Sequence, residues 1–299
     1  MRRTRLALVL DALLAVLAGL MWAVGVVLLR KGLSSSDFFS SAAVVTMIGN
    51  LIFWPIVLVL SPKSPFNVYG FLVLALAGLL HPGLVRLLYY LGISRVGVSV
   101  NASIYATYSL FGSLFAILLL NEQSTIILWL GIVSAVVGAV VIQFSVSNEN
   151  AAKSTKSGLL IPASASVTAG LSYVLKKMGL NFYGEPIVGV AMAYLISLIL
   201  YALMFTISPK VRSQTSINSH TFKLFWKTGL CDSIGFLLLF YAFQYGDVTM
   251  VTPLLQVQPL FILLLSYFYL RKIETLSKKL VLGTILIVLG IVLATAFKG

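Results

Sequence analysis

Ten long apolar stretches divide this 299-residue chain, and they constrain its fold more than any other feature. Each stretch has about 20 mainly apolar residues, enough for a helix rising about 1.5 Å per residue to cross a bilayer core. Turn-forming or charged residues separate them. We therefore expect ten membrane-spanning helices, at residues 7–30, 41–61, 68–92, 97–120, 125–146, 158–179, 186–207, 222–244, 248–270 and 278–297.

The composition excludes most other classes of protein. Hydrophobic residues make up 60% of the chain and charged residues only 10%, whereas a soluble domain is about 25% charged. A closed β-barrel is also excluded, because its strands would be about ten residues long and would alternate polar with apolar residues. The expected fold is an all-α integral membrane protein, since helices satisfy their own backbone polar groups in lipid.

The two halves of the chain repeat one pattern. A glutamate followed by two glycines occurs twice, and five further residues upstream match at an offset of 151. The repeated motifs are Glu122-x8-Gly131-x6-Gly138 and Glu274-x8-Gly283-x6-Gly290. Each half holds five spans, an odd number, so the second half must be inverted relative to the first, as in many secondary transporters. We predict five-helix repeats at residues 1–148 and 158–299, joined by a linker at 149–157.

Among the ionisable residues inside predicted spans, the informative ones are His81 and Arg86 in the third span and Asp232 in the eighth. Asp11 lies near the start of the first span, where it is expected to reach the interface. Such groups are costly in a membrane and face a cavity or a partner. His81 aligns with Asp232 at the repeat offset of 151. The two residues are either a structural or interfacial pair, or a pair that binds substrate or protons. Arg86 lies about 140° from His81 around a regular helix. Both can face one cavity only if Pro82-Gly83, which separates them, breaks the helix.

Polar residues form matching stripes on the fourth and ninth spans. Asn101, Tyr105, Tyr108 and Gly112 are spaced by 4, 3 and 4 residues, so they share one helix face. Their repeat counterparts are Thr252, Gln256, Pro259 and Leu263. Either the stripes hold helices together in lipid, or they line a cavity, which is the interpretation we favour. Gln258 lies off the stripe and is assigned to a helix–helix contact.

The fifth and tenth spans carry small residues instead of polar stripes. Gly131 and Gly138 lie in one, and Gly283 and Gly290 in the other. Small residues permit close helix packing, so we expect these helices to be peripheral or to pack as in a dimer. Trp22 in the first span and Tyr173 in the sixth are expected as cavity walls.

The net charge of +13 is interpreted as a matter of membrane orientation, because the basic residues lie at span ends and form no patch for nucleic acid. Seven lie on the side of the two termini and 13 on the other, with Arg86 inside the membrane. This count alone would place the termini outside, whereas the first span's Arg2-Arg3-Arg5 cluster favours termini inside. Four of these basic residues end the first and sixth spans: Arg30, Lys31, Lys176 and Lys177. They are either interfacial anchors, which is the interpretation we favour, or gates for an anionic substrate.

The junction between the third and fourth spans reads Arg86-Leu-Leu-Tyr-Tyr-Leu-Gly-Ile-Ser-Arg-Val-Gly-Val-Ser99. With the two five-span repeats and the acidic turn before each Gly-x6-Gly helix, it resembles the EamA-type transporters of the drug/metabolite transporter superfamily. That family often has a proline in the following span. Pro253 and Pro259 supply it in the second half, but Ala102 and Tyr108 occupy those places in the first, which leaves the shape of that helix open.

The resemblance implies a central cavity walled by spans 1, 3, 4, 6, 8 and 9, with spans 5 and 10 outside. It also implies termini inside, and export or exchange of amino acids, other metabolites, drugs, nucleotide sugars or phosphorylated sugars. The motifs HExxH, GxSxG and Walker A are absent from the sequence, so we expect no enzyme activity, metal or cofactor.

The leading hypothesis is a secondary transporter in the cell membrane that moves a small polar metabolite, such as an amino acid, by alternating access. Arg86 is expected to contact a carboxylate or phosphate of the substrate, and protons are a candidate coupling ion through His81 or Asp232. Expected partners are the substrate and membrane lipid, with the chain a monomer or homodimer. The alternative is a non-transporting receptor or scaffold subunit. The predicted substrate-binding residues are Trp22, His81, Arg86, Asn101, Tyr105, Tyr173, Asp232, Thr252 and Gln256.

Overall fold

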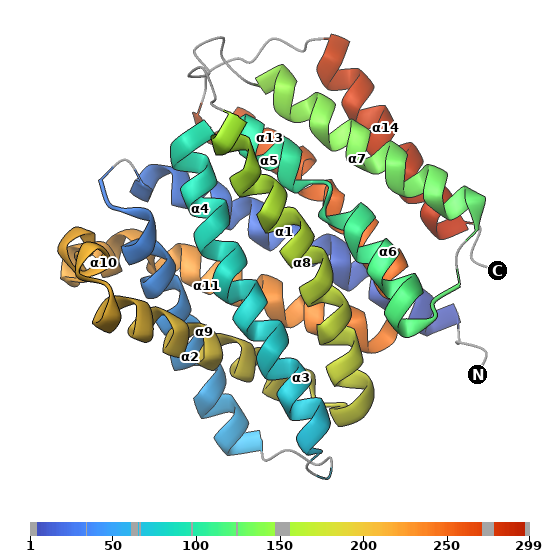
Figure 1. Ribbon diagram of the computed structural model, residues 1–299. Helices are drawn as coiled ribbons and strands as arrows, with labels where there is room; N and C mark the ends of the chain where they lie inside the picture. The colour runs from blue at the N-terminus through green and yellow to red at the C-terminus, as the bar shows by residue number, and fades with distance from the viewer. Residues whose placement is uncertain are drawn as a thin grey trace.

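The computed structural model describes residues 5–33, 35–60, 65, 67–96, 98–123, 125–146, 156–270 and 278–296. These residues form a bundle of long tilted helices (Figure 1). Seven helical segments are long and apolar enough to cross a membrane, and three further apolar helices are shorter. Together these ten segments occupy the ten predicted stretches, so the prediction of an all-α membrane protein is confirmed.

Each half contributes five helical rods, and some rods consist of two or three shorter helices. The first half contains α1 (Arg5–Leu33), α2 (Phe38–Leu60), α3 (Val68–Gly78), η1 (Leu79–Leu84), α4 (Val85–Val96), α5 (Val98–Tyr105), α6 (Tyr108–Leu120) and α7 (Ile126–Val146). The second half contains α8 (Lys156–Tyr183), α9 (Pro186–Ile207), the short α10 (Pro209–Gln214), α11 (Ser219–Tyr245), α12 (Val248–Leu254), η2 (Leu255–Val257), α13 (Gln258–Leu270) and α14 (Lys278–Ala296).

Local sequence sets several of the helix ends. The side chain of Asn67 accepts a hydrogen bond from the Gly70 amide at 2.8 Å and so caps the start of α3. α9 begins at Pro186, whose missing N–H costs nothing in the first turn. At the other end of a helix, Gly184 adopts a φ of 52° directly after α8. This left-handed conformation suits glycine and ends the helix.

The third rod is broken where the sequence predicts a break. His81 has an extended backbone (φ −146°, ψ 116°) and Pro82 follows it inside η1. The break frees carbonyl groups, and side chains of the second half satisfy them. Tyr201 donates its hydroxyl to the carbonyls of Pro82 (3.2 Å) and Gly83 (2.8 Å). The irregular backbone is therefore tolerated at membrane depth because it is buried in protein and hydrogen-bonded.

The fourth and ninth rods are also interrupted, at equivalent places in the two halves. The ninth changes to a 3-10 turn at Leu255–Val257, between Pro253 and Pro259. The fourth breaks after Tyr105 although it has no proline there, which answers the question its sequence left open. Contacts from the other half accompany this break: the Gln256 amide donates to the Ala106 carbonyl.

The two halves interlock rather than lying side by side. The first rod of the first half, α1, packs on α11 and on α12, η2 and α13 of the second half. The first rod of the second half, α8, packs in the same way on α3, η1 and α4 and on α5 and α6 of the first half. The inverted repeat predicted from the odd number of spans thus forms an interface through the centre of the molecule.

The glycine-bearing helices α7 and α14 lie side by side at one edge of the bundle (Figure 1). Gly290 approaches the α7 backbone so closely that a Cβ atom there would lie 2.5 Å from the Ala135 amide nitrogen and 2.6 Å from the Gly131 carbonyl oxygen. A Cβ at Gly138 would meet the Gly283 carbonyl oxygen at 2.7 Å. The close packing predicted for the fifth and tenth spans is therefore made by these two helices with each other.

The acidic turn of the first half binds a helix of the second. Glu122 Oε1 accepts a hydrogen bond from the Val248 amide at 2.9 Å, and Oε2 accepts from the amide and hydroxyl of Thr249 at 2.9 and 2.8 Å. These amides belong to the first turn of α12 and have no partner within the helix. Glu122→Ala should therefore lower the free energy of unfolding by about 1 kcal/mol, measured by thermal unfolding in detergent. No loss would contradict the capping role.

The Glu122 cap also predicts a pH dependence. Burial raises the pKa of the Glu122 carboxyl group above its ordinary value, although the hydrogen bonds from Thr249 and Val248 lower it in part. A raised pKa in the folded protein gives a stabilisation that is complete below the unfolded value of about 4.3 and is lost as the pH rises through the folded value. The Tm of the wild-type protein minus that of Glu122→Gln should therefore increase as the pH falls from about 7 to about 4. A Tm difference that decreases as the pH falls would mean that the hydrogen bonds from α12 outweigh burial in setting the pKa of Glu122.

Candidate functional site

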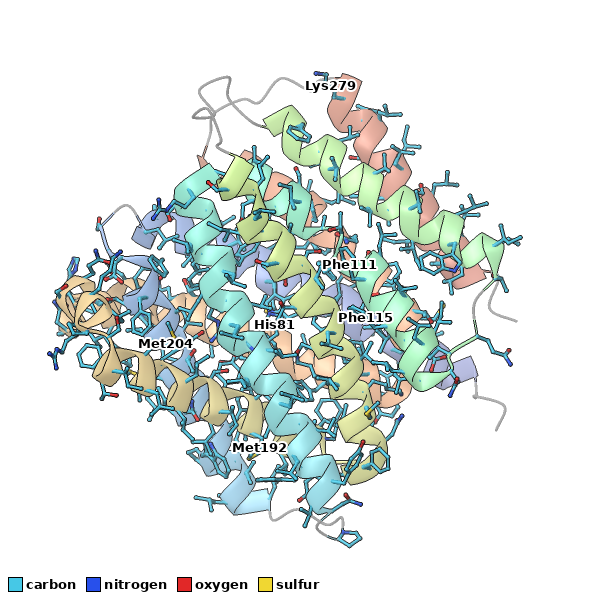
Figure 2. All side chains as sticks on the ribbon, in the orientation of Figure 1. His81, Phe111, Phe115, Met192, Met204 and Lys279 are labelled. Carbon is cyan, nitrogen blue, oxygen red and sulfur yellow. The ribbon has the colours of Figure 1, made fainter. Side chains whose placement is uncertain are left out.

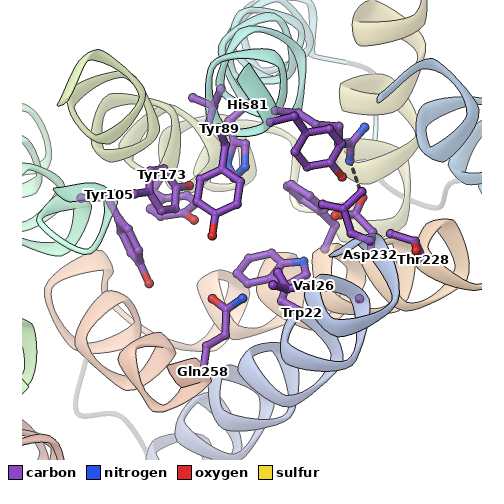
Figure 3. Close-up of a pocket in the computed structure, with 16 residues that line it drawn as sticks. Trp22, Val26, His81, Tyr89, Tyr105, Tyr173, Thr228, Asp232 and Gln258 are labelled. Atoms are coloured by element: carbon purple, nitrogen blue, oxygen red, sulfur yellow. Dashed lines mark hydrogen bonds and ion pairs between the residues drawn. The ribbon is translucent and has the colours of Figure 1, made fainter. Parts of the chain in front are cut away.

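A cavity of about 90 Å³ lies in the interface between the two halves. Its walls come from α1, η1, α4, α5, α6, α8, α11 and α13, which belong to spans 1, 3, 4, 6, 8 and 9. Figure 3 shows side chains from several of these helices pointing into one central space. The lining residues are Trp22, Gly25, Val26, Leu29, His81, Val85, Arg86, Tyr89, Tyr90, Tyr105, Tyr108, Tyr173, Thr228, Asp232, Phe236 and Gln258.

An ion pair between the halves is the main electrostatic feature of this cavity. Arg86 Nη2 donates to Asp232 Oδ2, and Arg86 Nη1 donates to the Thr46 hydroxyl. Tyr194 donates its hydroxyl to the same carboxylate oxygen at 2.6 Å. The guanidinium also lies over two rings, 5.3 Å from the centroid of Tyr194 and 5.8 Å from that of Phe236. The pair is therefore held by hydrogen bonds and by cation–π contacts.

The two members of the pair are not equally accessible. The side chain of Arg86 is 3% exposed and that of Asp232 is 16% exposed. In Figure 3 Asp232 stands beside Thr228 at one edge of the cavity, with the dashed line marking its bond to the guanidinium. The charged group that the cavity offers to a ligand is therefore chiefly the carboxylate. That Arg86 contacts a carboxylate or phosphate of the substrate stays a prediction.

The break in the third rod brings His81 and Arg86 into the same cavity. On a regular helix they would point in different directions, but the extended backbone at His81 changes the rotation between them. Figure 2 places His81 near the middle of the bundle, whereas Lys279 lies at its rim. His81 contacts two rings of the wall edge-on, with centroid distances of 5.5 Å to Tyr173 and 5.0 Å to Phe236. The ionic partner of Asp232 is nevertheless Arg86, not its repeat counterpart His81.

Aromatic rings form the rest of the wall. Centroid distances are 4.8 Å between Tyr89 and Tyr105, 5.1 Å between Tyr105 and Tyr108, and 5.4 Å between Tyr108 and Tyr173. Tyr89 approaches the central space from the side opposite to Trp22 and Gln258 (Figure 3). The wall thus combines apolar ring faces with hydroxyl and amide groups, which is typical of a site that selects a ligand by a few placed polar contacts.

Six of the nine predicted site residues line the cavity: Trp22, His81, Arg86, Tyr105, Tyr173 and Asp232. The other three lie outside it. Asn101 fills the notch beside Gly92, where a Cβ would lie 1.8 Å from its Oδ1, and its amide donates to the Tyr89 carbonyl at 3.2 Å. Thr252 donates its hydroxyl to Val248 in its own helix at 2.9 Å.

The roles predicted for Gln256 and Gln258 are exchanged in the structure. Gln256 is buried between the halves, where its amide donates to the Ala106 carbonyl and to the Ser109 hydroxyl. Gln258 lines the cavity, and its amide points into the central space (Figure 3). The reason is the 3-10 turn at Leu255–Val257, which changes the rotation along the rod between these two residues. The stripe predicted on the ninth span would require a regular helix through this turn.

Two polar partners of the ion pair come from spans that sequence reasoning did not assign to the site. Thr46 lies on α2 and Tyr194 on α9, and both are fully buried. Tyr194 fits against Gly49, where a Cβ would overlap its ring at 2.1 Å. Their helices carry other polar residues as well, such as Asn50 on α2 and Ser197 on α9, so the sequence offers no signal that singles out Thr46 and Tyr194.

Lys176 and Lys177 are not the interfacial anchors that the sequence predicted. Both are buried, because α8 continues to Tyr183 and so places them inside the bundle rather than at its surface. Lys176 Nζ donates to the Ser172 hydroxyl at 2.7 Å, and Lys177 Nζ donates to the Phe243 carbonyl at 2.6 Å. Neither lysine therefore belongs in the charge count that was used to orient the chain.

Comparison with known families agrees with this geometry. The EamA-like transporter family matches residues 10–144 and again residues 156–296, which together cover most of the chain. The chain belongs to this family. Its two matched stretches show that the EamA unit occurs twice, and the chain is accordingly a multi-pass membrane protein of a transporter family. The exact limits predicted for the halves stay predictions, and residues 147–155 of the linker region lie outside the described ranges.

A solved crystal structure shares the fold of this EamA-like protein. It matches with a TM-score of 0.77 over 96% of each chain, at 18% sequence identity. At this identity the likeness concerns the fold alone. No curated protein matches the sequence.

Proposed function

We propose that this EamA-like protein is a secondary transporter of the cell membrane, which moves a small polar metabolite carrying an amino group, such as an amino acid, by alternating access. The observation that carries the proposal is the cavity between the inverted halves, with Asp232 as its most accessible charged group. Binding sites of secondary transporters lie at such interfaces between repeats, near broken helices.

The charges of the site favour a zwitterionic substrate over a strongly charged one. Asp232 can accept a substrate ammonium group, while Arg86 offers a donor to a substrate carboxylate when the pair separates. The pair is neutral overall, so a zwitterion adds no uncompensated buried charge. The cavity volume of about 90 Å³ is well below the 300–1,000 Å³ or so typical of sites for drug-sized ligands, which favours a small solute.

The interlocked packing supports movement of one half against the other. α1 and α8 each pack on the opposite half, and the third, fourth and ninth rods have breaks close to the cavity. Rocking of the halves would then open the cavity to one side at a time without rebuilding the site. The ion pair bridges the halves, because Arg86 lies on α4 and Asp232 on α11. Substrate binding to the pair would therefore change a contact between the two halves.

Counterflow in proteoliposomes tests this function. Vesicles loaded with an unlabelled amino acid should take up the labelled compound by exchange, for at least one member of an amino-acid panel. Tyr89→Phe removes one hydroxyl group from the cavity and should raise KM roughly fivefold, which is the loss of about 1 kcal/mol. Tyr69→Phe is the matched control, because Tyr69 is 55% exposed and lies at the first turn of α3, outside the cavity lining.

The outcomes separate the proposed function from its alternative. A ligand that raises the Tm of the purified protein but shows no counterflow would favour a non-transporting receptor or scaffold subunit. Equal KM values for Tyr89→Phe, Tyr69→Phe and the wild-type protein would contradict the assignment of the cavity as the substrate site.

A further inference from the structure

Lys176 is the most completely buried charged side chain near the cavity, and the substrate site described above does not use it. It lies in the interior of α8 and is 0% exposed. Its Nζ atom has one hydrogen-bond partner in the described part of the chain, the Ser172 hydroxyl at 2.7 Å. Three rings surround the ammonium group, with centroid distances of 5.1 Å to Tyr173, 5.6 Å to Phe236 and 6.0 Å to Phe240.

Within the described residues, no carboxylate forms an ion pair with Lys176. The titratable and charged side chains on the elements packed against α8 include one acid, Asp232, and that carboxylate is already bound by Arg86 and Tyr194. Cation–π contacts compensate an ammonium group only in part. Among these groups are His81 of η1, Arg86 of α4, Tyr105 of α5, Tyr108 of α6, Tyr194 of α9 and Asp232 of α11. The same elements also carry Tyr89 and Tyr90 on α4, Tyr201 on α9 and Cys231 on α11, and α3 carries Tyr69.

Lys176 is separated from the cavity by a single layer of side chains. Tyr173 and Phe236, which surround its ammonium group, both line the cavity and both contact His81. Arg86 Cζ lies 5.8 Å and Lys176 Nζ 5.6 Å from the centroid of Phe236, so the two cations are at most 11.4 Å apart. The hydroxyl of Ser172, which accepts from Lys176, donates in turn to the Ala77 carbonyl at 2.8 Å, next to the break in the third rod.

From these contacts we expect the charge state of Lys176 to depend on what the cavity contains. A buried ammonium group without a counter-ion is unfavourable, and water in the adjacent cavity lessens that cost. A substrate that fills the cavity removes the water, and its own ammonium group at Asp232 adds a positive charge on the other side of Phe236. In a medium of low dielectric constant both effects disfavour a second cation at this distance.

We propose that Lys176 Nζ is the binding site of a coupling proton, and that this proton and the substrate exclude each other, so that the protein is a proton antiporter. When substrate binds, the Lys176 ammonium group gives one proton to water on that side and becomes a neutral amine. After the substrate has left on the other side, the amine takes up one proton there. This inference rests on the proposed transport function and assigns the coupling ion to a residue other than His81 or Asp232.

The first test measures binding rather than transport. Because coupling is reciprocal, a substrate that displaces a proton must bind more weakly as the pH falls. We expect the Kd of the amino acid identified by counterflow, measured by calorimetry on purified protein in detergent, to rise between about pH 9 and about pH 6. Lys176→Met should remove this pH dependence, and so should Lys176→Arg, because a guanidinium group keeps its proton. Proton release can also be measured directly, because substrate binding to the wild-type protein should release protons into a weakly buffered solution.

The Arg variant separates a proton site from a structural role. If Lys176 only fills space or supplies a fixed charge, Lys176→Arg restores the wild-type pH dependence, and that result would overturn the proposal. Loss of the pH dependence in His81→Gln with its retention in Lys176→Met would overturn it as well. Lys177→Met is the matched control: this neighbouring lysine is also buried but bonds to the Phe243 carbonyl, and the variant should keep the pH dependence.

The second test uses proteoliposomes and distinguishes this proposal from the transport function itself. An imposed pH gradient should drive uphill accumulation by the wild-type protein, and Lys176→Met should lose accumulation while keeping counterflow. Absence of counterflow in the wild-type protein would contradict the transport function. If the wild-type protein shows counterflow but its accumulation is independent of the pH gradient, the role of Lys176 is contradicted and the transport function is not. Accumulation that persists in Lys176→Met would have the same meaning.

Discussion

Asp232→Asn should abolish substrate exchange and lower the free energy of unfolding by about 3–5 kcal/mol, because it leaves the Arg86 guanidinium buried without its counter-ion. Because asparagine has nearly the same shape as aspartate, the losses of exchange and of stability measure the effect of removing the charge. Arg86 is 3% exposed, and the two other side chains that hold the pair, Thr46 and Tyr194, are neutral and cannot replace the carboxylate. Thermal unfolding in detergent and counterflow in proteoliposomes measure the two effects.

The double variant Arg86→Met/Asp232→Leu is the control for this prediction. Replacing both members of a buried ion pair with apolar side chains of similar size is often neutral or stabilising. The double variant should therefore recover most of the stability that Asp232→Asn loses, while its exchange activity stays absent. If Asp232→Asn is as stable as the wild-type protein, the pair does not hold the halves together. If the double variant still exchanges substrate, the pair is not the binding site.

Gly290→Ala should destabilise the protein by about 1–3 kcal/mol, although alanine is the better helix former. The added Cβ would lie 2.5 Å from the Ala135 amide nitrogen and 2.6 Å from the Gly131 carbonyl oxygen. Both are backbone atoms of α7, so no side chain can rotate away, and α7 and α14 must separate. Thermal unfolding in detergent measures the change, and Gly290→Val should have a larger effect than Gly290→Ala.

Gly112→Ala is the matched control for the α7–α14 contact. It also adds one methyl group to a helix, but the nearest atoms to its Cβ would be Thr252 Cγ2 at 3.6 Å and Gly170 Cα at 3.7 Å, which are ordinary van der Waals contacts. We expect its Tm to equal or exceed that of the wild-type protein. Equal Tm values for Gly290→Ala and Gly112→Ala would contradict the close contact between α7 and α14.

Much of the architecture could be predicted because each relevant signal is local. The length of the apolar stretches predicts the membrane helices, and the repeated Glu-x8-Gly-x6-Gly motif with five spans per half predicts the inverted repeat. Pro82 predicts the break that lets His81 and Arg86 face one cavity. Each signal can be recognised in the sequence alone, without knowledge of the packing.

The partners within the site could not be predicted in the same way. The repeat alignment of His81 with Asp232 gives equal depth in the membrane but says nothing about rotation around each helix. Arg86 therefore became the partner of Asp232 through the altered backbone at His81. The same reason applies to the exchange of roles between Gln256 and Gln258 at the 3-10 turn.

The sequence by itself determined the class of this protein, its ten apolar helices, its duplicated and inverted plan, and six of the residues that line its cavity. Only the tertiary structure decided which charges meet and which are hidden. Lys176 shows the physical reason: a lysine near the end of an apolar stretch reaches water if the helix ends there, and is buried if the helix continues. α8 continues to Tyr183 against the opposite half, and that long-range packing places the lysine beside the cavity instead of at the membrane surface.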